Sequence, residues 1–321
     1  MPRIFVLLPL ILSLVGCNGG PPTASRIEVG PRARALVAPG RLVAIGDLHG
    51  DLARTRQVLR MAGLVDEADR WIGGNSWVVQ TGDLTDKGPD TRAVLDLWMS
   101  LEKEAAAAGG RAIVLVSNHE ALNVTGVSGY VSDDDVLDFL PAGNTDRTAG
   151  EATVAELEEG AEARRVALGP QGVYGRWIAS HDAIVVVGDT VFLHGGLTPE
   201  QATRGLPALN AEIRAYLAAG RYEGLLEDRE GPLWYRGYLR DAEDHACPRL
   251  ARALAIVGAK RMVVGHTPQT DGRIGTRCGG RLIAIDTGIA AVMGGAPSAL
   301  ELTGGDAKAM HADGVVDLPD P

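Results

Sequence analysis

The chain has 321 residues, of which 45% are hydrophobic and 22% are charged, a composition typical of a globular protein with a sizeable core. Its formal net charge at pH 7 is −10, and a surface of that sign repels the phosphate backbone of nucleic acids. Aromatic residues make up only 4% of the chain, so few rings are present on which bases could stack. We therefore expect no nucleic-acid partner.

The first 16 residues are typical of an export signal. Arg3 precedes an apolar stretch, residues 4–12, that is too short to cross a bilayer as a helix. The sequence Leu14-Val15-Gly16-Cys17 follows and resembles the lipobox of bacterial lipoproteins, in which the cysteine is lipidated and becomes the first residue of the mature chain. This resemblance implies that residues 1–16 are removed and that Cys17 anchors the protein in the bacterial cell envelope, facing the periplasm. A plain secretory signal with an incidental cysteine is the alternative, and the choice between inner and outer membrane stays open.

Residues 17–39 are rich in Gly, Pro, Ala and Arg and are expected to form a flexible tether. From Leu42 onward, short runs rich in Val and Ile alternate with amphipathic stretches, which predicts an α/β domain with strands buried on both faces. Strands are expected at residues 42–45, 77–80, 112–116, 183–187, 191–193, 262–264 and 282–285. Helices are expected at residues 51–62, 90–107, 151–167, 208–219 and 248–254.

We expect one domain over residues 40–305, followed by a frayed tail at residues 306–321. An acidic segment with a helical pattern, at about residues 128–174, interrupts the rhythm of strands and is interpreted as an insertion. Cys247 and Cys278 flank a strand-and-loop unit, and an oxidising envelope would let them form a disulfide. Two separate buried thiols are the alternative.

Five predicted strands run directly into short sequences that combine Gly or Ser with Asp, Asn or His. These sequences are Gly46-Asp47-Leu48-His49-Gly50, Gly82-Asp83-Leu84-Thr85-Asp86-Lys87-Gly88, Ser117-Asn118-His119-Glu120, His194-Gly195-Gly196 and Gly265-His266-Thr267. Ligands bind at the carboxyl ends of the strands in open α/β sheets, so we expect these side chains to converge. Carboxylates, imidazoles and an amide without cysteine suit hard or borderline metal ions, and a shared carboxylate could hold two of them.

These sequences resemble the signature motifs of calcineurin-like metallophosphoesterases and, more narrowly, those of the phosphoprotein phosphatase superfamily. The segment Gly231-Pro232-Leu233-Trp234-Tyr235-Arg236-Gly237-Tyr238 is similar to the branch known as the Shewanella-like protein phosphatases. The resemblance covers residues 41–303 and implies an α/β metallophosphoesterase fold, in which helices flank a central β-sandwich.

The resemblance also implies a dinuclear site that holds two divalent or trivalent ions of Mn, Fe or Zn. Its ligands would be Asp47, His49, Asp83, Asn118, His194 and His266, with Asp83 shared between the two ions. The implied reaction is hydrolysis of a phosphate monoester by attack of a metal-bridging hydroxide. The substrate would be a phosphoprotein, at Ser/Thr or at Tyr, or a small phosphomonoester.

The family pattern assigns His119 as the acid that protonates the leaving-group oxygen and Asp86 as its orienting partner. Lys87, Arg236 and Asn118 would contact the phosphate. For Arg236, stacking on a neighbouring aromatic ring is the alternative interpretation.

Two residues depart from the family pattern. Lys87 stands where Arg is usual, and a lysine cannot make the planar two-point contact of a guanidinium with phosphate. Ser117 stands where Gly is usual, and it would be strained if the backbone there required a positive φ. Two other functions stay open: hydrolysis of dinucleoside polyphosphates, which similar motifs serve, and a non-catalytic phosphate-binding module on the same fold.

Overall fold

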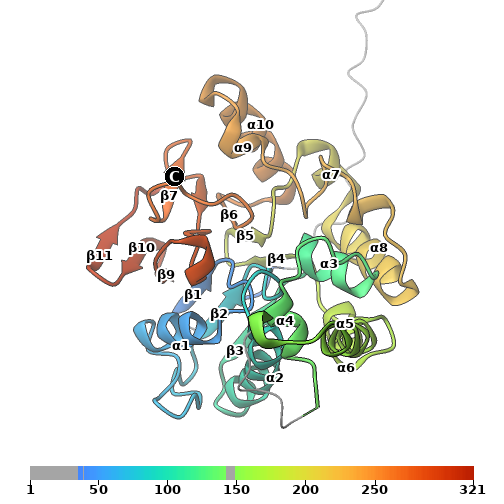
Figure 1. Cartoon of the computed structure of the whole chain (residues 1–321). Coiled ribbons are helices and arrows are strands. Elements are labelled where there is room, and N and C mark those ends of the chain that lie inside the picture. The colour runs from blue at the N-terminus through green and yellow to red at the C-terminus, as the bar shows by residue number, and fades with distance from the viewer. Residues whose placement is uncertain (1–34, 39, 142–148) are drawn as a thin grey trace, which may run out of the picture.

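The structure is a computed structural model that describes residues 35–38, 40–141 and 149–321. Two β-sheets form its core, and helices pack around much of them, whereas β10 and β11 lie at the left edge of the view (Figure 1). The six-stranded sheet has the order β11-β10-β9-β1-β2-β3, and the five-stranded sheet has the order β4-β5-β6-β8-β7. This architecture is the predicted α/β metallophosphoesterase fold with a central β-sandwich.

The first sheet is built on three parallel strands. These are β1 (Leu42–Ile45), β2 (Trp77–Gln80) and β3 (Arg111–Val114). On the other side of β1, the antiparallel strands β9 (Ser298–Thr303), β10 (Asp306–His311) and β11 (Gly314–Asp317) complete the sheet. The parallel strands all end at the same edge of the sheet, which places the loops that follow them together.

The second sheet also has three parallel strands, β5 (Thr190–Leu193), β6 (Arg261–Val264) and β8 (Leu282–Ala284). Antiparallel strands close its two sides, namely β4 (Ile184–Val187) next to β5 and β7 (Gly275–Arg277) next to β8.

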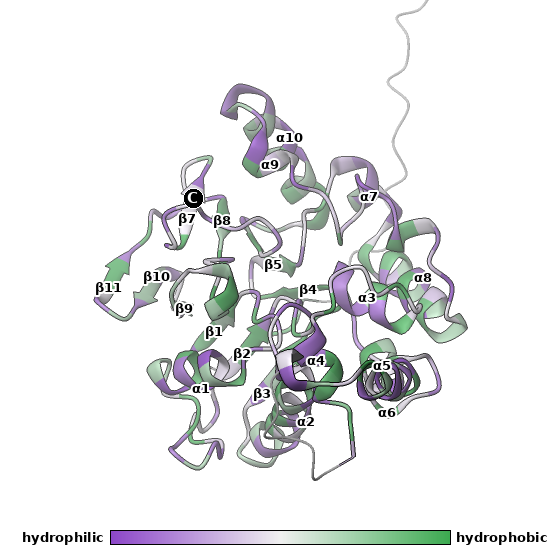
Figure 2. Ribbon diagram, in the orientation of Figure 1, coloured by the Kyte–Doolittle hydropathy of each residue, from purple (hydrophilic) through white to green (hydrophobic). Residues whose placement is uncertain are grey.

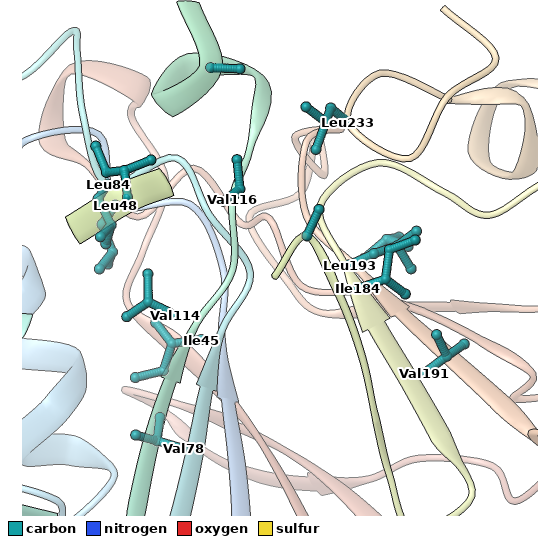
Figure 3. Close-up of a cluster of buried hydrophobic side chains, with 14 of the residues drawn as sticks. Ile45, Leu48, Val78, Leu84, Val114, Val116, Ile184, Val191, Leu193 and Leu233 are labelled. Carbon is teal, nitrogen blue, oxygen red and sulfur yellow. The ribbon is translucent and has the colours of Figure 1, made fainter. Parts of the chain in front are cut away.

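Alternation of side chains along each strand gives the domain two apolar layers. In β1, Ala44 packs in a cluster that combines residues of both sheets, such as Phe192 and Leu300. The neighbouring Val43 and Ile45 point to the opposite face and pack in the larger cluster, which also contains residues of the helices. Among the described residues, hydrophobic ribbon is prominent in the central strands (Figure 2). Figure 3 shows side chains of the larger cluster from both sheets.

The helices follow the strands in the expected alternation. They are α1 (Leu52–Met61), α2 (Thr91–Ala107), α3 (Asn118–Val124), α4 (Asp133–Leu137), α5 (Val154–Leu168), α6 (Val173–Ala179), α7 (Pro199–Arg204), α8 (Leu206–Ala219), α9 (Gly237–Arg240) and α10 (Glu243–Val257). Several begin at polar caps that the sequence supplies. Asp51 accepts a hydrogen bond from the backbone N–H of Arg54, and Thr153 forms a capping box with Glu156. None of the helices in the described ranges has both the length and the apolar character needed to cross a membrane.

The segment interpreted as an insertion contains α4, α5 and the start of α6, and it lies between β3 and β4 in the chain. The prediction of a frayed tail at residues 306–321 is wrong. Residues 306–311 form β10, which pairs with β9 over its whole length, and residues 314–317 form β11. Ala307 and Ala309 alternate with exposed polar residues and pack in the layer between the sheets. The buried apolar residues of this strand are small alanines and not Val or Ile, so the sequence does not read as a typical strand. The predicted signal, Cys17 and nearly all of the tether lie outside the described residues.

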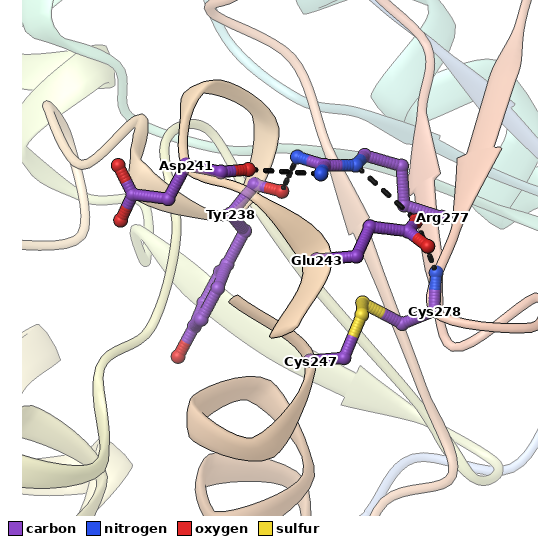
Figure 4. Close-up of a disulfide and its surroundings, with 6 residues drawn as sticks. All are labelled: Tyr238, Asp241, Glu243, Cys247, Arg277 and Cys278. Carbon is purple, nitrogen blue, oxygen red and sulfur yellow. Dashed lines mark hydrogen bonds and ion pairs between the residues drawn. A yellow bond between two sulfur atoms is a disulfide. The ribbon is translucent and has the colours of Figure 1, made fainter. Parts of the chain in front are cut away.

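A disulfide joins Cys247 in α10 to Cys278, which follows β7, and the two cysteines are 31 residues apart in the chain (Figure 4). Hydrogen bonds surround it. The Glu243 carboxylate accepts from the backbone N–H of Cys278 at 3.2 Å, and Arg277 donates to the carbonyl oxygen of Tyr238 at 2.6 Å. These contacts tie α9, α10 and β7 together, next to the loop that carries Arg236.

Candidate metal centre

The polar residues that follow the strands meet at one edge of the sandwich. Asp47 follows β1 in the first sheet, and His266 follows β6 in the second, yet the Asp47 carboxylate accepts the backbone N–H of His266 at 3.1 Å. The His194 ring, after β5, donates from Nδ1 to the carbonyl oxygen of Thr81, after β2, at 3.0 Å. The two sheets therefore bring their parallel-strand ends to a single site.

Asp83 lies at the centre of this site and is 2% exposed. Its Oδ2 atom is 3.4 Å from Nε2 of His49, and its Oδ1 atom is 3.3 Å from Nε2 of His194. Within the described residues, two fully buried groups of side chains have ligand atoms that all lie within 4.8 Å of one another. One consists of His49, Asp83 and His119, and the other of Asp83, His194 and His266. Asp83 belongs to both groups, as a carboxylate shared by two ions would.

Two buried polar atoms at the site have no hydrogen-bond partner within the described part of the chain. They are Oδ1 of Asn118 and Nε2 of His266. Buried polar atoms are nearly always paired, so such atoms beside a cluster of imidazoles and carboxylates are available as metal ligands. The residues present therefore fit a metal centre, and the six predicted ligands all lie at this edge of the sandwich.

The imidazoles are held in the form that binds metals. Nδ1 of His49 donates to the carbonyl oxygen of Thr85 at 3.2 Å, as His194 does to Thr81, so Nε2 of each ring is left to face Asp83. Burial lowers the pKa of His49 to about 3, that of His194 to about 4 and that of His266 to about 2. Neutral imidazoles are therefore the stable form at neutral pH.

The acidic residues concentrate negative charge where water is excluded. Burial by itself raises the pKa of the Asp83 carboxyl, but the four surrounding imidazoles hold that pKa well below its usual range. Burial, together with the neighbouring Asp286 and Asp83, raises the pKa of Asp47 well above its usual range. Burial also raises the pKa of Asp286 to about 6. Carboxylates gathered in this way are stabilised by cations, which metal ions would supply.

Asp286 was missed by the sequence analysis. It lies beside Asp47, with a hydrogen bond between the two side chains, and is 2% exposed. The signal was present, because Asp286-Thr287-Gly288 follows a predicted strand in the same way as the five sequences that were singled out.

The backbone at the site adopts a conformation that side chains usually avoid. Among the described residues, seven that are not glycine have a positive φ, and five of the seven are predicted site residues: His49, Asp83, Asp86, Lys87 and His266. Left-handed backbone of this kind is costly and concentrates at functional sites. The tight loops that it allows let each side chain turn back over the strand ends.

Ser117 is not strained, contrary to the possibility raised by the missing glycine. Its φ is −110°, and its hydroxyl caps the N-terminus of α3. The same hydroxyl lies within hydrogen-bond distance of the Asp83 and Glu120 carboxylates, and its one proton can be donated to either of them. Glu120, which the sequence analysis did not single out, also accepts the backbone N–H groups of Asp83 and Leu84, each at 2.9 Å. Ser117 and Glu120 thus fix the loop that presents Asp83.

His119 and Asp86 form a buried pair. Nδ1 of His119 lies 2.6 Å from Oδ2 of Asp86, and its Nε2 lies 3.8 Å from Oδ2 of Asp83, so this nitrogen faces the metal cluster. Burial lowers the pKa of His119, but the Asp83 and Asp86 carboxylates outweigh it and raise that pKa above its usual value. The exposed ring of Tyr130 lies 4.8 Å from the His119 ring. The geometry matches the predicted pairing of an acid with its orienting carboxylate.

Two cationic side chains reach the cluster from different loops. Nζ of Lys87 is 2.8 Å from Nε2 of His49, and an Nη atom of Arg236 is 3.4 Å from Nδ1 of His266. Other arginines stack on the aromatic rings next to Arg236: Cζ of Arg229 lies 4.0 Å from the centroid of the Trp234 ring, and Cζ of Arg249 lies 5.1 Å from that of Tyr235. Arg236 thus points to the cluster, and the structure does not show the stacking role considered for it.

Gly265 has a packing role that can be tested. A Cβ atom at this position would lie 2.3 Å from Oδ1 of Asp47. We expect Gly265→Ala to displace the Asp47 carboxylate and lower metal affinity by about 10–100-fold, the range for changes to groups that support ligands. The measurement is metal bound per chain over a Mn²⁺ titration. Gly40→Ala, whose Cβ would meet nothing within 4 Å, is the control, and equal affinities in the two variants would contradict the prediction.

Comparison with known proteins agrees with this geometry. The sequence model of the calcineurin-like phosphoesterase family matches residues 40–270. The chain is 35% identical over 295 residues to Shewanella-like protein phosphatase 2 of Arabidopsis thaliana, covering 82% of this chain and 75% of the relative. It is 30% identical over 259 residues to Shewanella-like protein phosphatase 1 of Plasmodium berghei, covering 78% and 67% of the two chains.

Among solved structures, the cold-active protein-tyrosine phosphatase of a psychrophilic Shewanella species superposes with a TM-score of 0.71 at 26% identity. The match covers 92% of this chain and 85% of the other. The family match, the relatives and the convergence of acidic and imidazole side chains at the strand ends all point the same way. The chain belongs to the calcineurin-like phosphoesterase family and is a hydrolase that acts on phosphate monoesters.

Proposed function

We propose that this hydrolase is a two-metal protein phosphatase that removes phosphate from Ser/Thr or Tyr side chains. The observation that carries the proposal is the Asp83 carboxylate, which lies between two groups of imidazoles and beside the His119–Asp86 pair. The names of the relatives and of the similar Shewanella structure support a protein substrate.

Asp47, His49, Asp83, Asn118, His194 and His266 would hold the two ions, which Mn, Fe or Zn would suit. Bound ions of this kind supply activation of water near neutral pH and neutralisation of charge on the phosphate oxygens. The chain itself supplies the remaining positive charge. Lys87 and Arg236 approach the cluster from separate loops, so a phosphate between them meets a cation on each side.

Protonation of the leaving group falls to His119. Its Nε2 faces the cluster, and the Asp86 carboxylate accepts from Nδ1, which fixes the ring and favours its protonated form. A protonated ring in this orientation can give its Nε2 proton to the oxygen that leaves phosphorus. Asn118 precedes His119 at the start of α3, so metal binding and proton donation are supplied by adjacent residues.

The proposed function predicts turnover of p-nitrophenyl phosphate and of phosphopeptides that requires Mn²⁺ and stops after chelation. His119→Asn should retain the metal but lose about 10²–10⁴-fold in kcat, the range for loss of an acid catalyst. Steady-state kinetics with metal analysis of both proteins makes the test. A metal-loaded parent without turnover would contradict a phosphatase and favour a binding module. Equal kcat in the variant and the parent would remove His119 from the role of acid.

We further propose that the protein is attached to the bacterial envelope through lipid on Cys17. The lipobox-like sequence at residues 14–17 supports this, and so does the Cys247–Cys278 disulfide, because such bonds persist in oxidising compartments. We expect Cys17→Ser to abolish labelling by a fatty-acid precursor and to release the protein from the membrane fraction of bacterial cells. Fractionation with immunoblotting makes the measurement, with Ser25→Ala in the expected tether as the control. The anchor would be refuted if the Cys17→Ser protein stayed in the membrane fraction as the Ser25→Ala control does, or if it took up the fatty-acid label as the control does.

A further inference from the structure

A buried arginine of the helical insertion contacts the His119–Asp86 pair. Arg164 lies in α5, is 5% exposed, and places Nη2 2.6 Å from Oδ1 of Asp86. Its Nε donates to Oδ2 of Asp135 in α4 at 3.0 Å, and its Nη1 donates to Oδ1 of Asn123 in α3 at 2.5 Å. The guanidinium thus joins α5 to α3 and α4, and it contacts Asp86 at the oxygen that is not bonded to His119.

The contacts of Asp86 divide between its two oxygens. Oδ1 accepts from Arg164 and from Nδ2 of Asn123, the latter at 3.0 Å, whereas Oδ2 accepts from Nδ1 of His119 at 2.6 Å. The Arg164 and Asn123 donors therefore fix the plane of the carboxylate on the side away from His119. A carboxylate held in this way presents Oδ2 to the imidazole in one orientation.

A purely structural role is the competing interpretation, because Asp135 also neutralises Arg164 and joins α4 to α5. A tie between two helices would not need to reach the catalytic pair, however. Removing an arginine and two carboxylates from water is costly, and an apolar pair would join the helices at lower cost. The bond to Asp86 is also no longer than the shortest bond to Asp135, at 2.6 Å against 2.8 Å.

We propose that Arg164 is a positioning residue, which holds Asp86 so that the His119 ring stays aimed at the leaving-group oxygen. The inference rests on the proposed function, in which His119 is the acid. It makes the insertion a working part of the active site, because an element outside the metal-binding loops sets the orientation of the proton donor. Arg164 touches neither a predicted metal ligand nor the cationic side chains that would bind phosphate.

The test compares leaving groups. A misplaced proton donor slows esters with poor leaving groups most, because a good leaving group departs without a proton. We expect Arg164→Lys to lower kcat for phenyl phosphate by about 10²-fold, the scale for a misplaced catalytic group, with a smaller loss for p-nitrophenyl phosphate. KM and bound metal should stay near the parent values. Arg165→Ala, which removes only an exposed ion pair with Glu162, is the matched control and should leave both substrates unaffected.

A second variant separates positioning from folding. A cavity of about 480 Å³ borders the Arg164 side chain and is also lined by Asn123 and Leu168, so Arg164→Ala leaves a space that a small cation can enter. Added methylguanidinium should restore part of the lost kcat of Arg164→Ala for phenyl phosphate, whereas methylammonium at the same concentration should restore less. Melting temperature and bound metal are measured on the same samples.

The outcomes are distinct. An active parent whose Arg164 variants lose equal rate for both leaving groups, or lose only melting temperature or metal, would overturn the positioning role and leave the proposed function intact. A metal-loaded parent that turns over neither ester would overturn both. A selective loss for phenyl phosphate, with rescue by methylguanidinium, would support the inference.

Discussion

The site depends on one electrostatic constraint, the burial of the Asp83 carboxylate among imidazoles at the junction of two sheets. Asp83 is 2% exposed, and Asp47 and Asp286 add two further buried carboxyl groups beside it. Within the described residues, the nearby cations Lys87 and Arg236 approach the imidazoles at the margin of the cluster. Additional positive charge, which a pair of metal ions would supply, stabilises such a cluster in its ionised form.

The fold is arranged around that constraint. Six parallel strands, three in each sheet, end at a common edge and deliver acidic, amide and imidazole side chains to it. Left-handed backbone at His49, Asp83 and His266 turns the loops back over the strand ends. Close packing at Gly265 also brings the site residues together, because a methyl group at this position would occupy the space of the Asp47 carboxylate. Left-handed backbone and glycine, which has no side chain, therefore let the acidic and imidazole groups of the site approach one another.

Much of this could be predicted from the sequence. Val- and Ile-rich runs located the buried parallel strands to within about two residues, a usual uncertainty for element ends. The polar residues that follow them predicted where the site would form. Asp286 follows the same rule, because it comes directly after the strand expected at residues 282–285, although it was not singled out.

The remaining features could not be predicted, and the reasons are physical. β10 and β11 carry few of the large apolar residues that mark a strand, and their pairing with β9 is a property of the assembled sheet. The contact between Arg164 and Asp86 joins residues 78 positions apart, and in the sequence Arg164 is one of two adjacent arginines in an acidic helix. Only the packing of α5 against α3 and α4 shows that Arg164 is buried while Arg165 is exposed.

Electron paramagnetic resonance of the protein titrated with Mn²⁺ tests the central claim most directly. If Asp83 is shared between two ions, the spectrum at two equivalents per chain shows two spin-coupled ions, and Asp83→Asn abolishes the coupling. One bound ion per chain, or two ions with the spectrum of isolated Mn²⁺, would contradict the shared carboxylate on which the site is built.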